Sequence, residues 1–250
     1  MGTLIDGMKE IFASANQTNP AKIPTCANDG TPNGSITPAN LATLVKADRK
    51  IEFIDMGLPS GRLWASKNIG AETITDYGAY FSWGNVQGQK PNGTTFSVGF
   101  GTGNDTEPYV SSEGAALTGD IPLQQDAANY YLGGSCRMPT TGEYAELFNG
   151  SYTKYIDAAG NEVTGTNKLV TLHGVTGIYL ESRVNGNRIF FPCAGNGYGT
   201  SLYDAGACGL YWARSLASST NGYNLHFNSG GVNPQNGNGR YVGFSVRAVQ

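Results

Sequence analysis

Apolar positions follow two different spacings along the chain, and the change between them falls near residue 50. Around residues 4–12, apolar side chains recur at the three- and four-residue spacing of an amphipathic helix. A second short helix is expected after Thr37, which is a common N-cap residue, because Pro38 suits the first helical position. From Ile51 onward, short stretches alternate between apolar and polar residues, as strands do. The sequence therefore predicts an N-terminal helical segment, residues 1–50, and a main domain, residues 51–250.

The main domain is expected to mix short strands, short helices and long loops. The alternating pattern predicts strands at residues 51–56, 63–65, 76–84, 168–172, 177–182 and 187–191. Helices are predicted at residues 126–132 and after Thr140, where Glu143 stands three residues later and completes a capping box. Asn185 and Gly186 predict a hairpin turn between the last two strands. Residues 85–125 show no sustained periodicity and are expected to form a long loop, so the fold class predicted is α+β.

Composition excludes two classes of partner. Only 14% of the residues are charged, the net charge is −3 and the pI is about 5.4. Nucleic-acid binding through phosphate neutralisation is therefore not expected. No apolar run approaches the ~20 residues that span a bilayer, so membrane insertion is not expected either. Residues 1–20 lack the apolar core of a signal peptide.

The last sixty residues alternate between two kinds of position. One kind is expected to be fixed by packing: Phe191, Pro192, Trp212, Phe227, Phe244, Val246 and Arg247. The other kind has no consistent chemistry and is expected to contact a ligand: Asn196, Tyr198, Tyr203, Asp204, Cys208, Leu210, Ala213, Arg214, Ala217, His226, Gly237, Gly239 and Val242. A rigid frame with mismatched residues suits a binding face, whereas an enzyme needs convergent acid, base or metal chemistry. We expect the contact residues to share one face formed by residues 196–217 and 226–242. Tyr198, Tyr203 and Tyr241 are the favoured contacts, because tyrosine supplies large, rigid area.

Candidate metal and redox residues are few. The chain has four cysteines: Cys26, Cys136, Cys193 and Cys208. None has Cys-x-x-Cys spacing, and they are expected to be free buried thiols. One disulfide among them is the alternative, and the sequence does not assign its partners. Cys193 and Cys208 stand fifteen positions apart and are not expected to form a reactive pair. His173 and His226 have no Cys or His partner at metal-ligand spacing. Residues 233–235 resemble a calcium motif but lack companion carboxylates. We therefore expect no metal, no cofactor and no enzymatic activity.

Three tryptophans and two arginines are assigned to the frame of the domain. Trp64, Trp83 and Trp212 are expected in the core, where large aromatic side chains contribute most to packing. Arg137 and Arg247 are expected to be structural, hydrogen-bonded to carbonyl groups or a carboxylate beneath the binding face.

An ordered set of motifs resembles a known bacterial and phage family. The motifs stand at residues 55–65 (Asp-Met-Gly-Leu-Pro-Ser-Gly-x-Leu-Trp-Ala), 77–84, 133–143 (Gly-Gly-x-x-Arg-Met-Pro-Thr-x-x-Glu), 191–195, 211–212 and 245–247. Together they resemble the C-type-lectin-fold domains related to formylglycine-generating enzyme, which occur in Bacteroidales surface proteins and in variable proteins of diversity-generating retroelements. The resemblance covers about residues 51–250. It implies a C-type lectin fold with short, twisted antiparallel strands, two or more short helices and long loops.

The codon usage of such retroelements adds a second point of resemblance. In these proteins template adenines are mutated, so asparagine codons become NNC or NNT, which never encode Trp, Met, Lys, Glu or Gln. Residues 196–250 contain no Met, Lys or Glu. The expected contact positions hold only permitted residues, while Trp212, Gln235 and Gln250 would belong to the fixed frame. The variable region would then span about residues 193–250.

The resemblance implies a ligand-binding display protein on a phage tail or a bacterial cell surface. Its partner would be a protein or glycan receptor on a bacterial surface. Residues 1–50 would connect the domain to a larger particle or build an oligomer, a homotrimer in the case of a tail fibre. The alternatives are a non-diversified Bacteroidales surface adhesin domain of the same fold and an oxidase of the formylglycine-generating type.

Overall fold

The computed structural model describes residues 51–102 and 119–250, and the expected N-terminal segment, residues 1–50, lies outside this part. The described part is mixed α+β, as the sequence predicts, and strands dominate it. The helices are η2 (Leu123–Gln125), α3 (Ala127–Leu132) and α4 (Thr141–Leu147). The strands are β1 (Phe53–Asp55), β2 (Leu63–Ala65), β3 (Tyr80–Phe81), β4 (Thr153–Tyr155), β5 (Val170–Leu172), β6 (Val175–Ser182), β7 (Arg188–Pro192), β8 (Asn196–Tyr198), β9 (Ser201–Tyr203), β10 (Gly209–Leu216), β11 (Asn221–Asn228), β12 (Gly231–Gly239) and β13 (Phe244–Ser245).

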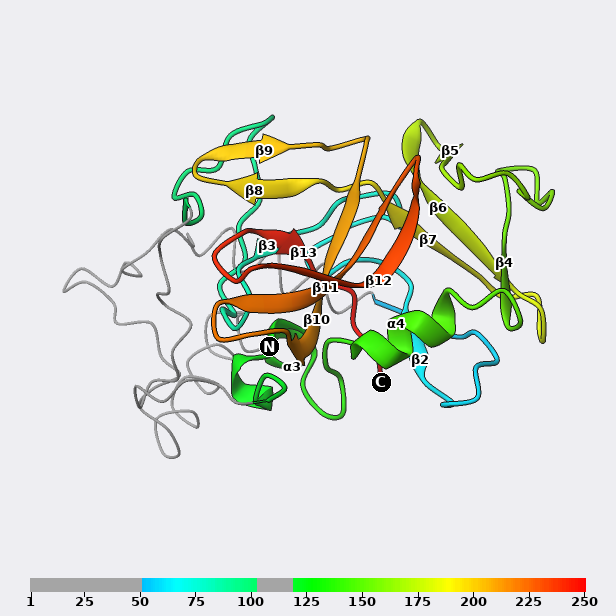
Figure 1. Ribbon diagram of the computed structural model, residues 1–250, viewed down its shortest axis with the longest axis horizontal. Helices are drawn as coiled ribbons and strands as arrows, with labels where there is room; N and C mark the ends of the chain where they lie inside the picture. The colour runs from blue at the N-terminus through cyan, green and yellow to red at the C-terminus, as the bar shows by residue number, and fades with distance from the viewer. Residues whose placement is uncertain (1–50, 103–118) are drawn as a thin grey trace, which may run out of the picture. The chain divides into compact units, whose positions relative to one another are not determined.

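A five-stranded sheet in the order β12-β11-β10-β13-β3 organises the domain (Figure 1). The strands β10, β11 and β12 form an antiparallel meander, in which Leu210 stands opposite His226. β13 returns along the other side of β10 and is parallel to it, with Tyr211 opposite Ser245. This one parallel pair departs from the antiparallel strands that the sequence leads us to expect. β13 also pairs with β3, in antiparallel orientation, which brings residues 80–81 and 244–245 into one sheet.

A second sheet holds β4, β6 and β5 in that order, and β7 pairs with β6. The turn between β6 and β7 lies where the Asn185-Gly186 dipeptide predicts it. Ser182 N donates to Asn187 O at 2.8 Å, and Gly186 has φ +75°. The C-terminus closes the domain near β2, because Val249 pairs with both Trp64 and Arg137 (Figure 1).

Local sequence signals place the helices accurately, but the strand predicted at residues 76–84 is too long. Thr140 and Glu143 form the expected capping box at the start of α4. The Asp126 carboxylate caps α3 by accepting from the backbone N–H groups of Ala128 and Asn129. By contrast, the strand expected at residues 76–84 shrinks to Tyr80–Phe81, because the backbone turns to positive φ at Gly78 and Gly84.

Among the described residues, buried side chains form two large core clusters and one small cluster. Trp64, Trp83 and Trp212 are fully buried, which confirms their assignment to the core. No helix in the described ranges is long and apolar enough to cross a membrane.

Candidate ligand-binding face

Strands β8 and β9 form an antiparallel hairpin (Figure 1). Main-chain hydrogen bonds hold this hairpin on both of its sides. On the β8 side, Gly197 N donates to Gly243 O at 2.8 Å, and Gly243 N donates back to Gly197 O at 2.9 Å. On the β9 side, Leu202 N donates to Thr94 O at 2.9 Å, and Phe96 N donates to Thr200 O at 2.8 Å. The hairpin is therefore an extension of the fold with little freedom of its own.

Two phenylalanines support the hairpin from the inside. The rings of Phe96 and Phe100 meet edge to face, with centroids 4.9 Å apart. Gly197 and Gly243 lie directly against Phe100: a Cβ at either position would approach its ring to within 2.3 Å and 2.4 Å, respectively. Only glycine fits at these two positions without displacing the ring.

Tyr198 and Tyr203 lie on this hairpin, and Tyr241 lies beside Tyr198. We call these three residues the tyrosine face. Tyr198 is 38% exposed and Tyr203 is 49% exposed. The Tyr198 ring centroid lies 6.4 Å from that of Tyr203 and 6.2 Å from that of Tyr241. The Tyr198 hydroxyl donates to Thr102 O at 2.7 Å. These contacts restrict the orientation of the rings, and rings held in this way would lose little entropy on binding a ligand.

Asp204 continues the surface from Tyr203 toward β11. It is exposed and has φ +56°, and its carbonyl accepts from Ala207 N and Cys208 N, both at 3.0 Å. Burial lowers the pKa of the half-buried His226, while the Asp204 carboxylate acts in the opposite direction. Burial raises the pKa of the Cys208 thiol, and Asp204 adds to that effect. Asp204 therefore lies within electrostatic reach of both Cys208 and His226.

The remaining accessible positions form a second group at the other end of β10 and β12. It comprises Arg214, Ala217, Gly237 and Gly239. Arg214 belongs to the frame, because its Nη2 donates to Ile121 O at 2.8 Å and its Nε lies 3.6 Å from an Asp120 carboxylate oxygen. A Cβ at Gly239 would come within 2.4 Å of the Tyr241 ring, so Tyr241 lies over this glycine as well as beside Tyr198. Tyr241 therefore connects the second group to the tyrosine face.

Three of the expected contact residues are buried, and the prediction that they meet a ligand is wrong. Leu210 and Val242 are 8% exposed, and Ala213 is not exposed at all. Leu210 and Val242 pack in one large cluster with Trp212, whereas Ala213 packs in the other with Tyr211. β10 stands in the middle of the sheet with side chains covered on both faces, so alternate residues along it do not alternate between core and solvent.

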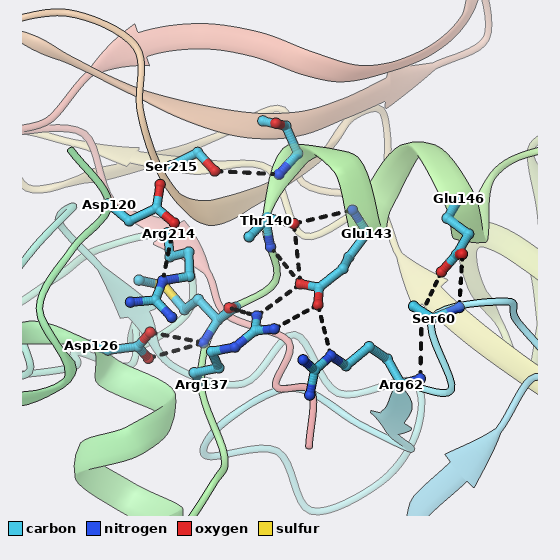
Figure 2. Close-up of polar contacts among 12 residues, drawn as sticks. Ser60, Arg62, Asp120, Asp126, Arg137, Thr140, Glu143, Glu146, Arg214 and Ser215 are labelled. Carbon is cyan, nitrogen blue, oxygen red and sulfur yellow. Dashed lines mark hydrogen bonds and ion pairs between the residues drawn. The ribbon is translucent and has the colours of Figure 1, made fainter.

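A polar network ties α4 to the rest of the domain (Figure 2). Arg137 donates two hydrogen bonds to the Glu143 carboxylate, at 2.7 Å and 2.5 Å, and Arg62 Nε lies 3.0 Å from the same group. Burial alone would raise the pKa of Glu143, but hydrogen bonds from Arg137 and Thr140 and the charge of Arg62 lower it. Glu146 accepts from Ser60, and Arg214 N donates to Pro139 O at 2.8 Å. The network is structural, as expected for Arg137.

Arg247 is the second structural arginine, and it is fully buried. It donates to Asn68 Oδ1, Ala65 O and Phe190 O, each at 2.9 Å. Its guanidinium carbon lies 4.4 Å from the Phe191 ring centroid. Burial lowers the pKa of Arg247 to about 10. Its carbonyl partners match the role that the sequence predicts.

The described cysteines, Cys136, Cys193 and Cys208, are free, and residues 51–102 and 119–250 contain no group of three or more His, Cys, Asp or Glu side chains that could hold a metal ion. Sequence reasoning missed the support that residues 94–102 give to the hairpin, since it treated residues 85–125 as a loop. The two phenylalanines spaced four apart in that polar stretch were the available signal.

No family model matches the chain, and no curated protein and no solved structure matches it either.

Proposed function

We propose that this chain is a ligand-binding display protein with a C-type lectin fold, whose residues from about 193 to 250 carry retroelement-diversified contact positions. Its partner is a protein or glycan receptor on a bacterial surface, and it acts on a phage tail or a cell surface. The contact set is the tyrosine face together with Asn196, Asp204, Cys208 and His226. Ala217, Gly237 and Gly239, the members of the second group other than the structural Arg214, adjoin it through Tyr241.

The observation that carries the proposal is the tyrosine face, presented on a hairpin that main-chain hydrogen bonds and two phenylalanine rings hold in place. Interfaces concentrate binding energy in tyrosine, tryptophan and arginine, and rigid aromatic contacts lose little entropy on binding. Within residues 193–250 the exposed acidic side chain is Asp204, whereas Arg240 and Arg247 are buried. A nearly neutral aromatic face favours contact by shape and stacking over electrostatic attraction.

The oxidase alternative is disfavoured by the state of the thiols. Burial raises the pKa of Cys193 to about 12 and also raises that of Cys208. Thiols of this kind are protonated near neutral pH, whereas catalytic cysteines react as thiolates. The adhesin alternative shares the binding face and differs only in whether the gene is diversified.

Binding to bacterial cells tests the display role. The fluorescently labelled chain is titrated against a panel of bacterial strains by flow cytometry. For any strain that binds, Tyr198→Ser/Tyr203→Ser is expected to weaken binding on the order of tenfold or more, as loss of hot-spot side chains does. Tyr130→Ser is the matched control, because Tyr130 is 42% exposed on α3, away from the hairpin. Protease and periodate treatment of the cells separates protein receptors from glycans. An equal loss of binding in the double tyrosine variant and in Tyr130→Ser would show that the tyrosine face is not the binding site.

A folding control accompanies the binding experiment. The double tyrosine variant is expected to change the free energy of unfolding little, because surface substitutions usually stay within about 0.5 kcal/mol each. Trp212→Ala is expected to cost about 3–5 kcal/mol, since the side chain is fully buried. Deep sequencing of the gene in its natural population then distinguishes the two surface roles. Substitutions concentrated at the contact set indicate diversification, and an even spread over contact and frame codons indicates an ordinary adhesin.

A further inference from the structure

The two chain segments that enter and leave the β8–β9 hairpin meet at its base, and each carries a cysteine. Cys193 follows β7, and Cys208 precedes β10. Gly206 N donates to Cys193 O at 2.7 Å, and Gly195 N donates to Cys208 O at 2.8 Å. These two hydrogen bonds hold residues 193–195 against residues 206–208, although fifteen positions separate the two cysteines.

The two thiols differ in access to solvent. Cys193 is fully buried, and Cys208 is half-buried beside the exposed Asp204. Burial is the larger cause of the raised pKa of Cys193, and the charge of Cys208 is the second, so the two sulfur atoms lie within electrostatic reach of each other. Cys208 is therefore the thiol that meets a reagent from solution first, and Cys193 stands behind it.

We propose that Cys193 and Cys208 form a disulfide when the protein is exposed to glutathione disulfide. This disulfide would hold the base of the β8–β9 hairpin closed. The inference goes beyond the proposed function and does not depend on it, because it concerns the bond and the stability of the hairpin, whatever the hairpin binds.

The exchange balances in two steps. The Cys208 thiolate attacks one sulfur of glutathione disulfide, which forms a mixed disulfide and releases one glutathione thiolate that takes up a proton. Cys193 then loses its proton and attacks the Cys208 sulfur, which forms the Cys193–Cys208 bond and expels the second glutathione. Two protein thiols are oxidised and one glutathione disulfide is reduced to two thiols. Because burial raises the pKa of Cys193, the second step is expected to be the slower one and to accelerate with rising pH.

The bond would close a loop that contains the whole hairpin. A cross-link across about fifteen residues removes chain entropy from the unfolded state. For a chain of this size the stabilisation corresponds to a rise in thermal midpoint on the order of 5–10 °C. The hairpin amides, Tyr198 and Tyr203 among them, are then expected to exchange with deuterium more slowly, since the base can no longer open.

The test uses the full chain with Cys26→Ser, which removes a competing thiol outside the described residues. The protein is equilibrated with excess glutathione disulfide at pH 8.5, quenched with an alkylating agent and digested without reduction. The expected result is a linked peptide pair containing Cys193 and Cys208, together with the rise in thermal midpoint and its loss on reduction. A stable glutathione adduct on Cys208 with Cys193 still alkylatable after unfolding would overturn the proposal, as would two free thiols.

Two cysteine variants separate disulfide formation from simple addition of glutathione. Cys136→Ser in the same background is the matched control and is expected to form the linked pair as before, because Cys136 lies elsewhere, between α3 and α4. Cys193→Ser is expected to stop at the mixed disulfide on Cys208 and to show no rise in midpoint. If Cys193→Ser gains the same rise in midpoint as the parent, glutathione addition alone explains the shift and the proposed disulfide is refuted.

Discussion

At the scale of single residues, burial decides which side chains form the frame and which are displayed. Arg247, Arg137 and Trp212 were assigned correctly from sequence, because a lone arginine or tryptophan among apolar residues has few stable environments. Leu210 and Val242 were assigned wrongly, because an aliphatic side chain suits a core and a contact face equally well. Residue type alone predicts the frame better than it predicts the display surface.

Replacing Arg247 is expected to be among the most damaging single changes in the domain. Arg247→Met removes the guanidinium donors to Ala65 O, Phe190 O and Asn68 Oδ1, so these buried acceptors each lose a hydrogen bond. The expected loss is about 3–5 kcal/mol of unfolding free energy, measured by urea denaturation. Arg183→Met is the control, since Arg183 is 41% exposed and pairs with Glu162 at the surface, where such pairs contribute up to about 1 kcal/mol. Similar losses in the two variants would contradict the structural role of Arg247.

His226 is expected to give the domain a mild sensitivity to acid. Its ordinary pKa is 6.5, and burial lowers the pKa in the folded protein. As pH falls below about 6.5, the unfolded chain takes up a proton that the folded protein does not, so the unfolding free energy decreases. The decrease stops once the pH is below the folded pKa. His226→Gln is expected to flatten the stability profile between pH 6.5 and 5, as measured by thermal midpoint. An identical slope in wild type and variant would exclude His226 as its cause.

At the scale of elements, signals contained within a few residues were sufficient for prediction. The capping box of α4, the N-terminal boundary of α3 and the Asn185-Gly186 turn depend on neighbours in sequence, and all three are correct. The burial of the residues of β10 could not be predicted from neighbours in sequence. Its burial depends on β11 and β13 beside it and on layers above and below, none of which the local pattern of apolar residues specifies. The support of the hairpin by residues 94–102 is likewise a product of tertiary contacts.

The capping box of α4 gives the element-scale prediction. Thr140→Ala removes the hydroxyl that accepts from Glu143 N at 3.2 Å and donates to the Glu143 carboxylate. The expected cost is about 0.5–2 kcal/mol of unfolding free energy in urea. Thr141→Ala is the matched control at the next position, where the side chain is outside the capping box. A larger loss for Thr141→Ala than for Thr140→Ala would show that the box does not define the start of α4.

At the scale of the whole molecule, the domain depends on contacts between distant parts of the chain. Tyr80 pairs with Ser245, Trp64 pairs with Val249, and Arg247 donates to Ala65 O. The α+β class followed from the mixture of elements, but the sheet order did not, because no local signal specifies which strands meet across more than a hundred residues. The pairing of Val249 with Trp64 joins the C-terminal residues to β2, near the start of the described residues.

Assembly is the property that belongs to the whole chain, and residues 1–50 are expected to provide it. Their two short amphipathic segments offer too little apolar surface to fold alone, so they need a partner, either the main domain or another subunit. Oligomerisation would join several weak contacts and raise avidity without any new contact. Light scattering is expected to report a larger number of subunits, three for a tail fibre, for the full chain than for a chain beginning at Lys50. If both chains show the same number of subunits, the N-terminal segment packs on its own domain and does not mediate assembly.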